Sequence, residues 1–198
     1  MKKNMRRIHE PSEIFTVTVR VGESDDPEGR TVRWKTEKQV DLILDQFGKW
    51  LAGLIRPVPG AATPKTVTLK DTGGTNRTVY VFGTSSAGSQ VFNGQLAGTR
   101  VGVGSSNQAA ARTDYNLISQ LGSLAETNDG LWDSGAGTIT FVGSVYLSAG
   151  GTVRETGFFG YWYEGTGSRY TFMLFRDVIS DVVIGAGKYA HIQYTINL

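Results

Sequence analysis

Cysteine is absent from the 198 residues, and histidine occurs only at His9 and His191. These shortages exclude a disulfide framework and a thiolate or histidine-rich metal site, so we expect no metal and no cofactor. Long apolar runs are also missing. The nearest candidate, 40–55, contains three charged residues and is too short and too polar to span a bilayer, so we expect no membrane partner.

Net charge is close to zero, because 20 Lys and Arg face 18 Asp and Glu. This balance gives no strong reason to expect nucleic acid as a partner. Residues 1–12 form a basic N-terminal arm containing Lys2, Lys3, Arg6 and Arg7, which is either a loose terminus or an arm that docks on a partner. No apolar stretch of a secretory signal follows it, so we expect a protein made and kept inside a cell until it is assembled.

The last third of the chain predicts four β-strands, at 138–147, 153–163, 170–179 and 189–198. They are rich in Val, Ile, Thr and aromatic residues and are bounded by turn residues. In the last run Ala190, Ile192, Tyr194 and Ile196 alternate with polar residues, which predicts one core face and one wet face. We expect the four runs to be consecutive hydrogen-bonded neighbours in a two-layer antiparallel β-sandwich.

Further strands are predicted at 14–21, 31–35, 65–70, 77–82 and 100–104. The first alternates strictly, with Val17, Val19 and Val21 on one face. The runs 65–70 and 77–82 flank a Gly-Gly reversal and predict a hairpin. Between these strands we expect a long surface loop over 83–98 and an irregular strap across the sheet over 108–124.

One amphipathic helix is predicted, over 36–55. Thr36 and Gln39 have the spacing of a capping box, and apolar residues then recur at intervals of three and four. The apolar stripe includes Phe47 and Trp50, and it could cover an open end or face of the sandwich or form a subunit contact. Membrane-surface binding is the weakest alternative, because the polar face carries aspartates instead of a basic array.

The aromatic run 158–163 is the most unusual short segment. Alternating aromatic residues along a strand mostly fill a core on one face and a subunit contact on the other. A platform that stacks on sugars or bases is the alternative. On the first reading the candidate interface residues are Phe47, Trp50, Phe159, Tyr161, Trp162 and Tyr163.

Four carboxylates of the strand region, Glu155, Glu164, Asp177 and Asp181, are the candidates for acid–base chemistry. Two of them at a suitable separation could serve a glycosidase, but nothing in the sequence brings any two together. The Gly-x-Ser-x-Gly elbow of a serine hydrolase is absent. We therefore expect a protein that is not an enzyme and has no catalytic residues.

Six short runs in the second half form an ordered series of strand signatures. They are Val101–Gly104, Arg112–Leu117, Ile139–Gly143, Glu155–Phe159, Met173–Val178 and Ile192–Leu198. This series resembles small virion structural proteins of tailed and other double-stranded DNA viruses of bacteria and archaea. The resemblance does not extend to the first hundred residues.

The resemblance implies a jelly-roll-like β-sandwich that serves as a capsid decoration, turret, minor capsid or tail component. It implies a virion protein made in the host cytoplasm, with other virion proteins as partners and a homo-oligomeric state. We treat 13–198 as a single domain that includes the helix. The alternative is a glycan- or receptor-binding module at a virus tip or tail fibre, which would use the aromatic run or the loop 83–98.

Overall fold

The computed structural model describes residues 16–39, 44–55, 65–82, 98–128, 130–163 and 169–197. Within these ranges the chain is mainly β. Its elements are β1 (Thr16–Ser24), β2 (Arg33–Gln39), α1 (Asp45–Ile55), β3 (Lys65–Lys70), β4 (Asn76–Phe82), β5 (Gly98–Gly104), β6 (Gln120–Glu126), β7 (Leu131–Asp133), β8 (Thr138–Leu147), β9 (Gly151–Tyr163), β10 (Arg169–Ile184) and β11 (Lys188–Asn197).

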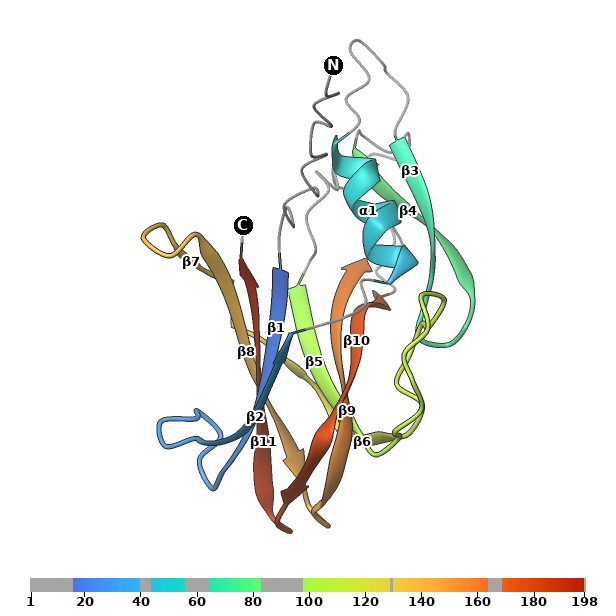
Figure 1. Cartoon of the computed structure of the whole chain (residues 1–198). Coiled ribbons are helices and arrows are strands. Elements are labelled where there is room, and N and C mark those ends of the chain that lie inside the picture. Colours follow the sequence, from blue (N-terminus) through green and yellow to red (C-terminus); the bar gives the residue numbers. More distant parts are fainter. Residues whose placement is uncertain are drawn as a thin grey trace, which may run out of the picture.

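Two antiparallel sheets form the body of the molecule (Figure 1). Sheet A has the strand order β2-β1-β11-β8-β7, and sheet B has the order β10-β9-β5-β6. The strands β3 and β4 form a separate hairpin, as their flanking of the Gly-Gly reversal predicted. The prediction of a mainly β, antiparallel fold is confirmed.

The core lies between the two sheets and is built from the inward faces of both. Val19 of β1, Val101 of β5 and Ile192 of β11 are all completely buried in it. The Tyr194 ring lies 5.3 Å from Phe158, and its hydroxyl donates a hydrogen bond of 2.9 Å to Thr156 Oγ1. Burial of this hydroxyl raises the pKa of Tyr194. The alternation predicted for β1 and β11 therefore identifies their core faces correctly.

The four closing runs are strands, and of their three predicted consecutive pairings β9–β10 is confirmed, whereas β8–β9 and β10–β11 are wrong. The strands β8 and β11 pair with each other in sheet A, and β9 pairs with β10 in sheet B. The chain changes sheets between β8 and β9 at Gly150 (φ 68°) and between β10 and β11 at Gly187 (φ 74°). Glycine tolerates this left-handed backbone, which allows successive apolar strands to face each other across the core.

Residues 36–39, which were predicted as the first turn of a helix, belong to β2. They pair with β1 in register, so that Glu37 lies opposite Arg20 and forms an ion pair of 2.9 Å with it. This pairing overrides the local capping-box pattern. The helix α1 begins at Asp45 and is correspondingly shorter than predicted; residues 40–43 lie outside the described ranges.

The helix packs its apolar stripe onto one end of the sandwich (Figure 1). Phe47 is 9% exposed, and its ring lies 4.8 Å from that of Phe175. Trp50 and Leu51 are partly buried against the same core. Phe47 is thus a core residue, and its prediction as an interface residue is wrong because the chain itself covers it.

Lysines of β2 cover the open edge of β10. Lys38 Nζ donates to the carbonyl oxygen of Val178 and to Asp177 Oδ1, at 2.9 Å each. Lys35 Nζ donates to the carbonyl oxygen of Val183 at 2.5 Å. Because an edge strand otherwise offers unpaired carbonyl groups to other chains, these lysines protect β10 from the addition of a further strand.

Towards α1 the same edge of β10 is bonded by two other donors. Gln46 Nε2 of α1 donates to the carbonyl oxygen of Met173 at 3.3 Å, and the N–H of Thr72 donates to the carbonyl oxygen of Thr171 at 2.9 Å. These bonds attach both the helix and the β3–β4 hairpin to sheet B.

His191 lies on the face of β11 that was expected to be wet, yet it is completely buried. Its Nδ1 lies 2.8 Å from Ser144 Oγ, and its Nε2 lies 3.0 Å from the carbonyl oxygen of Asp26. The turn after β1 covers the ring so closely that a Cβ at Gly29 would lie 2.8 Å from Nδ1. Burial lowers the pKa of His191 below the ordinary histidine value.

We predict that His191 makes folding stability depend on pH below about 6.5. As the pH falls, the unfolded chain takes up a proton that the buried ring resists, so the free energy of unfolding decreases. Replacing the ring by a neutral amide in His191→Gln should weaken this dependence between about pH 7.5 and 5.5. Urea unfolding of both proteins at the two pH values measures it, and equal pH dependence would contradict the assignment.

Candidate functional site

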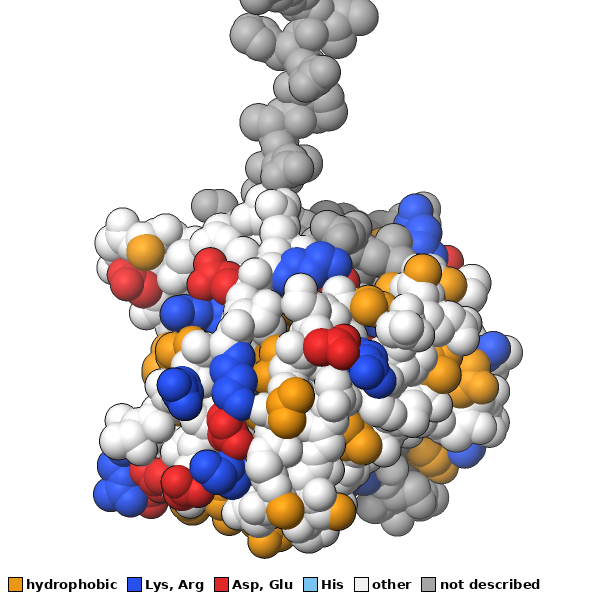
Figure 2. Space-filling model, turned by 60° about the horizontal axis from the view of Figure 1, so that its bottom comes forward, with side chains coloured by type: hydrophobic (Ala, Val, Ile, Leu, Met, Phe, Trp, Pro, Cys, Tyr) orange, Lys and Arg blue, Asp and Glu red, His pale blue; other side chains and the backbone are white. Residues whose placement is uncertain are grey.

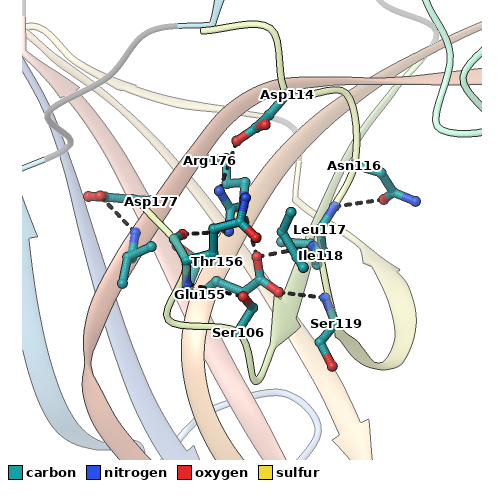
Figure 3. A network of polar contacts seen from close by, with 12 residues as sticks. Ser106, Asp114, Asn116, Leu117, Ile118, Ser119, Glu155, Thr156, Arg176 and Asp177 are labelled. Atoms are coloured by element: carbon teal, nitrogen blue, oxygen red, sulfur yellow. Dashed lines mark hydrogen bonds and ion pairs between the residues drawn. The ribbon is translucent and has the colours of Figure 1, made fainter. Parts of the chain in front are cut away.

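A buried charged site lies on the outer face of sheet B, beneath residues 105–119, which we call the strap (Figure 3). Arg176 of β10 and Glu155 of β9 form its centre, and both side chains are completely buried. Their contact joins Arg176 Nε to Glu155 Oε2 at 2.8 Å. A buried ion pair is tolerated only where the remaining donors and acceptors are also satisfied, which the strap accomplishes.

Arg176 binds the strap at two points before its end. Its Nη1 donates to Asp114 Oδ2 at 2.8 Å, and its Nη2 donates to the carbonyl oxygen of Gln108 at 3.0 Å. Glu155 binds the end of the strap, where its Oε1 accepts the N–H of Ser119 at 2.8 Å. The two charged groups therefore hold both parts of the strap on the sheet.

Glycine at position 104 is required for this arrangement. A Cβ there would lie 2.3 Å from Glu155 Oε1 and 2.6 Å from the carbonyl oxygen of Ser119. Any larger residue would push the strap from the carboxylate. The irregular strap predicted over 108–124 is confirmed as far as Ser119, whereas residues 120–124 belong to β6 because they pair with β5.

An apolar cluster under the strap continues the site. Phe159 packs there with Leu44, Leu117 and Met173, and it is completely buried. Because Phe158 points into the sandwich and Phe159 points under the strap, both are core residues. The prediction of Phe159 as an interface residue is therefore wrong.

The strap also positions α1 and the hairpin. The N–H of Asp45, the first residue of α1, donates to the carbonyl oxygen of Arg112 at 3.0 Å, and Arg112 Nε binds Asp45 Oδ1 at 2.9 Å. Asn116 Nδ2 donates to the carbonyl oxygen of Thr72 in the β3–β4 turn at 3.2 Å. One irregular segment thus holds together sheet B, the helix and the hairpin.

The carboxylates considered for catalysis make internal contacts. Glu155 binds Arg176, and buried Asp177 binds Lys38. Asp181 is exposed and forms two hydrogen bonds of 3.0 Å with Arg154. Glu164 lies outside the described residues. Figure 3 shows Asp177 directed away from the contact between Glu155 and Arg176.

Within the described residues, no cluster of three or more potential metal-ligating side chains occurs. In the same part of the chain, no helix has the length and apolarity needed to cross a membrane. On the face shown in Figure 2, basic and acidic side chains lie beside one another, and apolar side chains occur in small groups.

Tyr161 is partly buried beneath two cations. Arg100 Cζ lies 5.2 Å and Arg169 Cζ 4.9 Å from the centre of its ring, and both arginines pair with Glu126. Sequence reasoning missed this cluster because β5 brings Arg100 from a distant part of the chain. A sugar that stacked on the part of the Tyr161 ring under these cations would have to displace them.

The remaining predicted site residues are Trp50 and a group that lies outside the described part of the chain. The arm residues Lys2, Lys3, Arg6 and Arg7 lie outside the described ranges, as do the side chains of Trp162 and Tyr163. Trp50 is partly buried against the core.

The exposed large apolar residues of the described chain were also missed. Leu131 and Trp132 of β7 are 62% and 57% exposed, and Tyr146 of β8 is 50% exposed. The only sequence signal for β7 is a three-residue apolar and acidic run between turn residues, which is too short for a periodicity.

Comparisons with protein families, with curated proteins and with solved structures found no match.

We predict that Arg176→Met destabilises the fold by about 3–5 kcal/mol, because Glu155 would remain buried without its cation. The matched control is Arg154→Met, which breaks an exposed ion pair between the same two strands and should cost at most about 1 kcal/mol. Urea unfolding measures both changes.

A second variant covers the case in which Arg176→Met fails to fold. The double substitution Arg176→Met with Glu155→Gln removes the uncompensated charge and should recover part of the lost stability. Equal costs for Arg176→Met and Arg154→Met would contradict the structural role assigned to the buried pair.

Proposed function

We propose that this chain is a structural protein of a virion, a capsid decoration, minor capsid or tail component, that acts by assembling with itself and with other virion proteins. The observation that carries the proposal is the exposure of Leu131 and Trp132 on β7. A large aromatic residue on an accessible edge is the type of side chain that contributes most to protein–protein binding.

The position of β7 supports an assembly role. It is the last strand of sheet A and, among the strands that the structure describes, pairs only with β8, so its other side can accept a further strand. By contrast, lysines bind the carbonyl groups of β10 at an edge of sheet B. The molecule thus protects the edge strand β10 of sheet B and leaves the apolar edge strand β7 of sheet A accessible.

The connections between the sheets support the jelly-roll-like arrangement that the resemblance implies. The chain passes from β8 in sheet A to β9 and β10 in sheet B and returns to sheet A as β11. Such crossings between two layers occur in double-sheet jelly rolls, a class that includes viral capsid and lectin domains. Together with the strand signatures of the second half, they favour a virion component.

We predict that the purified protein is an oligomer and that Trp132→Ser weakens its association by at least about tenfold, because the substitution removes a buried aromatic anchor from the interface. Val183→Ser is the matched control. Val183 is 63% exposed, but its carbonyl group is already bonded by Lys35. Light scattering after size-exclusion chromatography, over a dilution series, measures the masses of all three proteins.

The proposal fails if the wild-type protein stays monomeric at every concentration and ignores capsid and tail proteins. An oligomer that responds equally to Trp132→Ser and Val183→Ser would also contradict the assignment of β7 as the interface.

One observation favours glycan binding as a second candidate function. Tyr146 and Tyr189 lie opposite each other on β8 and β11, with ring centres 5.1 Å apart, and Tyr146 is half-exposed. Exposed tyrosine rings beside polar side chains can stack on sugar rings. A receptor-binding module at a virus tip would therefore use this pair instead of Tyr161, whose ring lies beneath two cations.

A glycan array tests this second function. We predict a signal that Tyr146→Ala removes, because the substitution deletes the exposed ring, while Trp132→Ser leaves it unchanged. An empty array, or a signal that survives Tyr146→Ala, would contradict glycan binding at the tyrosine pair.

A further inference from the structure

A groove of about 600 Å³ lies between α1, the hairpin strand β3 and the strap. Helix α1 forms one wall, β3 forms the other, and the strap closes one end. The residues used below are Lys49, Ala52, Val67, Thr68, Lys70 and Arg112.

The edge of β3 that faces the helix is its open edge. The N–H of Asp71 donates to the carbonyl oxygen of Thr75, so Asp71 directs its backbone groups towards β4. In an antiparallel pair every second residue does the same, and the residues between them direct their N–H and C=O groups to the opposite side. Leu69 and Val67 therefore exchange bonds with β4, while Lys70 and Thr68 direct their N–H and C=O groups away from it. The N–H of Lys70 does point away from β4, because it donates to Gln46 Oε1 of α1 at 2.6 Å.

Gln46 forms a hydrogen bond with the open edge of β3 at one residue, Lys70. Its buried amide accepts from Lys70 and donates to Met173 of β10, so it takes the place that a neighbouring strand would occupy. Two residues earlier, Thr68 lines the groove, and no described side chain bonds its backbone groups there. A strand entering the groove would find a donor and an acceptor at Thr68.

The groove carries an excess of positive charge. Lys49 on the helix and Lys70 on β3 form no ion pair with any carboxylate of the described residues, although Lys70 Nζ lies 5.0 Å from the centre of the Tyr115 ring. Arg112 is neutralised by Asp45. Ala52 and Val67 line the same groove and contribute apolar surface.

We propose that this groove binds an extended acidic segment of a partner protein, which adds to β3 as a further strand. Main-chain hydrogen bonds to Thr68 would give affinity, and the alternation of side chains would direct acidic groups to Lys49 and Lys70 and apolar groups to Val67. This inference goes beyond self-assembly at β7, because it assigns a second surface and the chemistry of its partner.

The probe is a fluorescein-labelled, acetylated hexapeptide of alternating glutamate and valine, with the lysine–valine peptide as its counterpart. Fluorescence anisotropy should show binding of the acidic peptide with a Kd below about 1 mM and no binding of the basic one. Added salt should weaken the interaction, since it screens the lysines. The double substitution Lys49→Glu and Lys70→Glu should weaken it by at least about tenfold.

Strand addition is separated from simple charge attraction by a backbone variant. Thr68→Pro removes the N–H at the open edge and leaves the bonds between β3 and β4 in place. It should weaken peptide binding by at least about tenfold, whereas Thr68→Val, which keeps the N–H, should bind like the wild type. If Thr68→Pro does not fold, peptides N-methylated at alternate positions test the same hydrogen bonds on the wild-type protein.

Three results would overturn the proposal. They are absence of acidic-peptide binding up to about 1 mM, equal binding of the basic peptide, and unchanged binding after Thr68→Pro or peptide N-methylation. A fourth result would come from light scattering with and without the peptide. If the peptide dissociates an oligomer, the groove is occupied by a second copy of this chain and not by a different partner protein. None of these results depends on Trp132, so failure here leaves the proposed assembly role to its own test.

Discussion

The buried ion pair between Arg176 and Glu155 is the interaction on which the outer layer of the molecule depends. It holds the strap on sheet B through Asp114, Gln108 and Ser119. The strap in turn covers a second apolar cluster and bonds the first residue of α1 and the β3–β4 turn. Buried ion pairs are costly to form, and apolar substitutes are often at least as stable. The benefit here is that an irregular segment is held in one position, which fixes the end of the groove between α1 and β3 that the strap closes.

The treatment of strand edges connects the fold to its proposed activities. Lys35, Lys38 and Gln46 bond carbonyl groups on the outer edge of β10, so that this edge is closed to other chains. The edges of β7 and β3 are treated differently. At β7 a Leu–Trp pair is exposed beside an open strand, which suits contact with an apolar surface, and at β3 two lysines flank an open backbone, which suits an acidic strand. An assembly protein with these two surfaces could bind copies of itself and a different partner at the same time.

Periodicity predicted what depends on neighbours in sequence, including the core faces of β1 and β11 and the β3–β4 hairpin. It could not predict the strand order of the two sheets, because that order depends on turns such as Gly150 and on burial across the whole chain. The same limit explains residues 36–39, where pairing with β1 replaced a local helix signal. Phe159 illustrates a further ambiguity: an apolar outer face is covered here by the chain's own strap, and alternation alone cannot distinguish that from a subunit contact. Glu155 was recognised as a notable carboxylate, but its partner Arg176 was not, since the pair forms only between folded strands.

Amide hydrogen exchange at Ser119, followed by NMR in the unmodified protein, tests the central claim most directly. Its N–H binds the buried carboxylate of Glu155 inside an irregular segment, where exposed amides would ordinarily exchange rapidly. If the ion pair holds the strap as described, this amide should be protected nearly as strongly as amides of the central strands. Exchange at the rate of an open loop would show that the strap opens independently of the sandwich, and the account of the outer layer would be wrong.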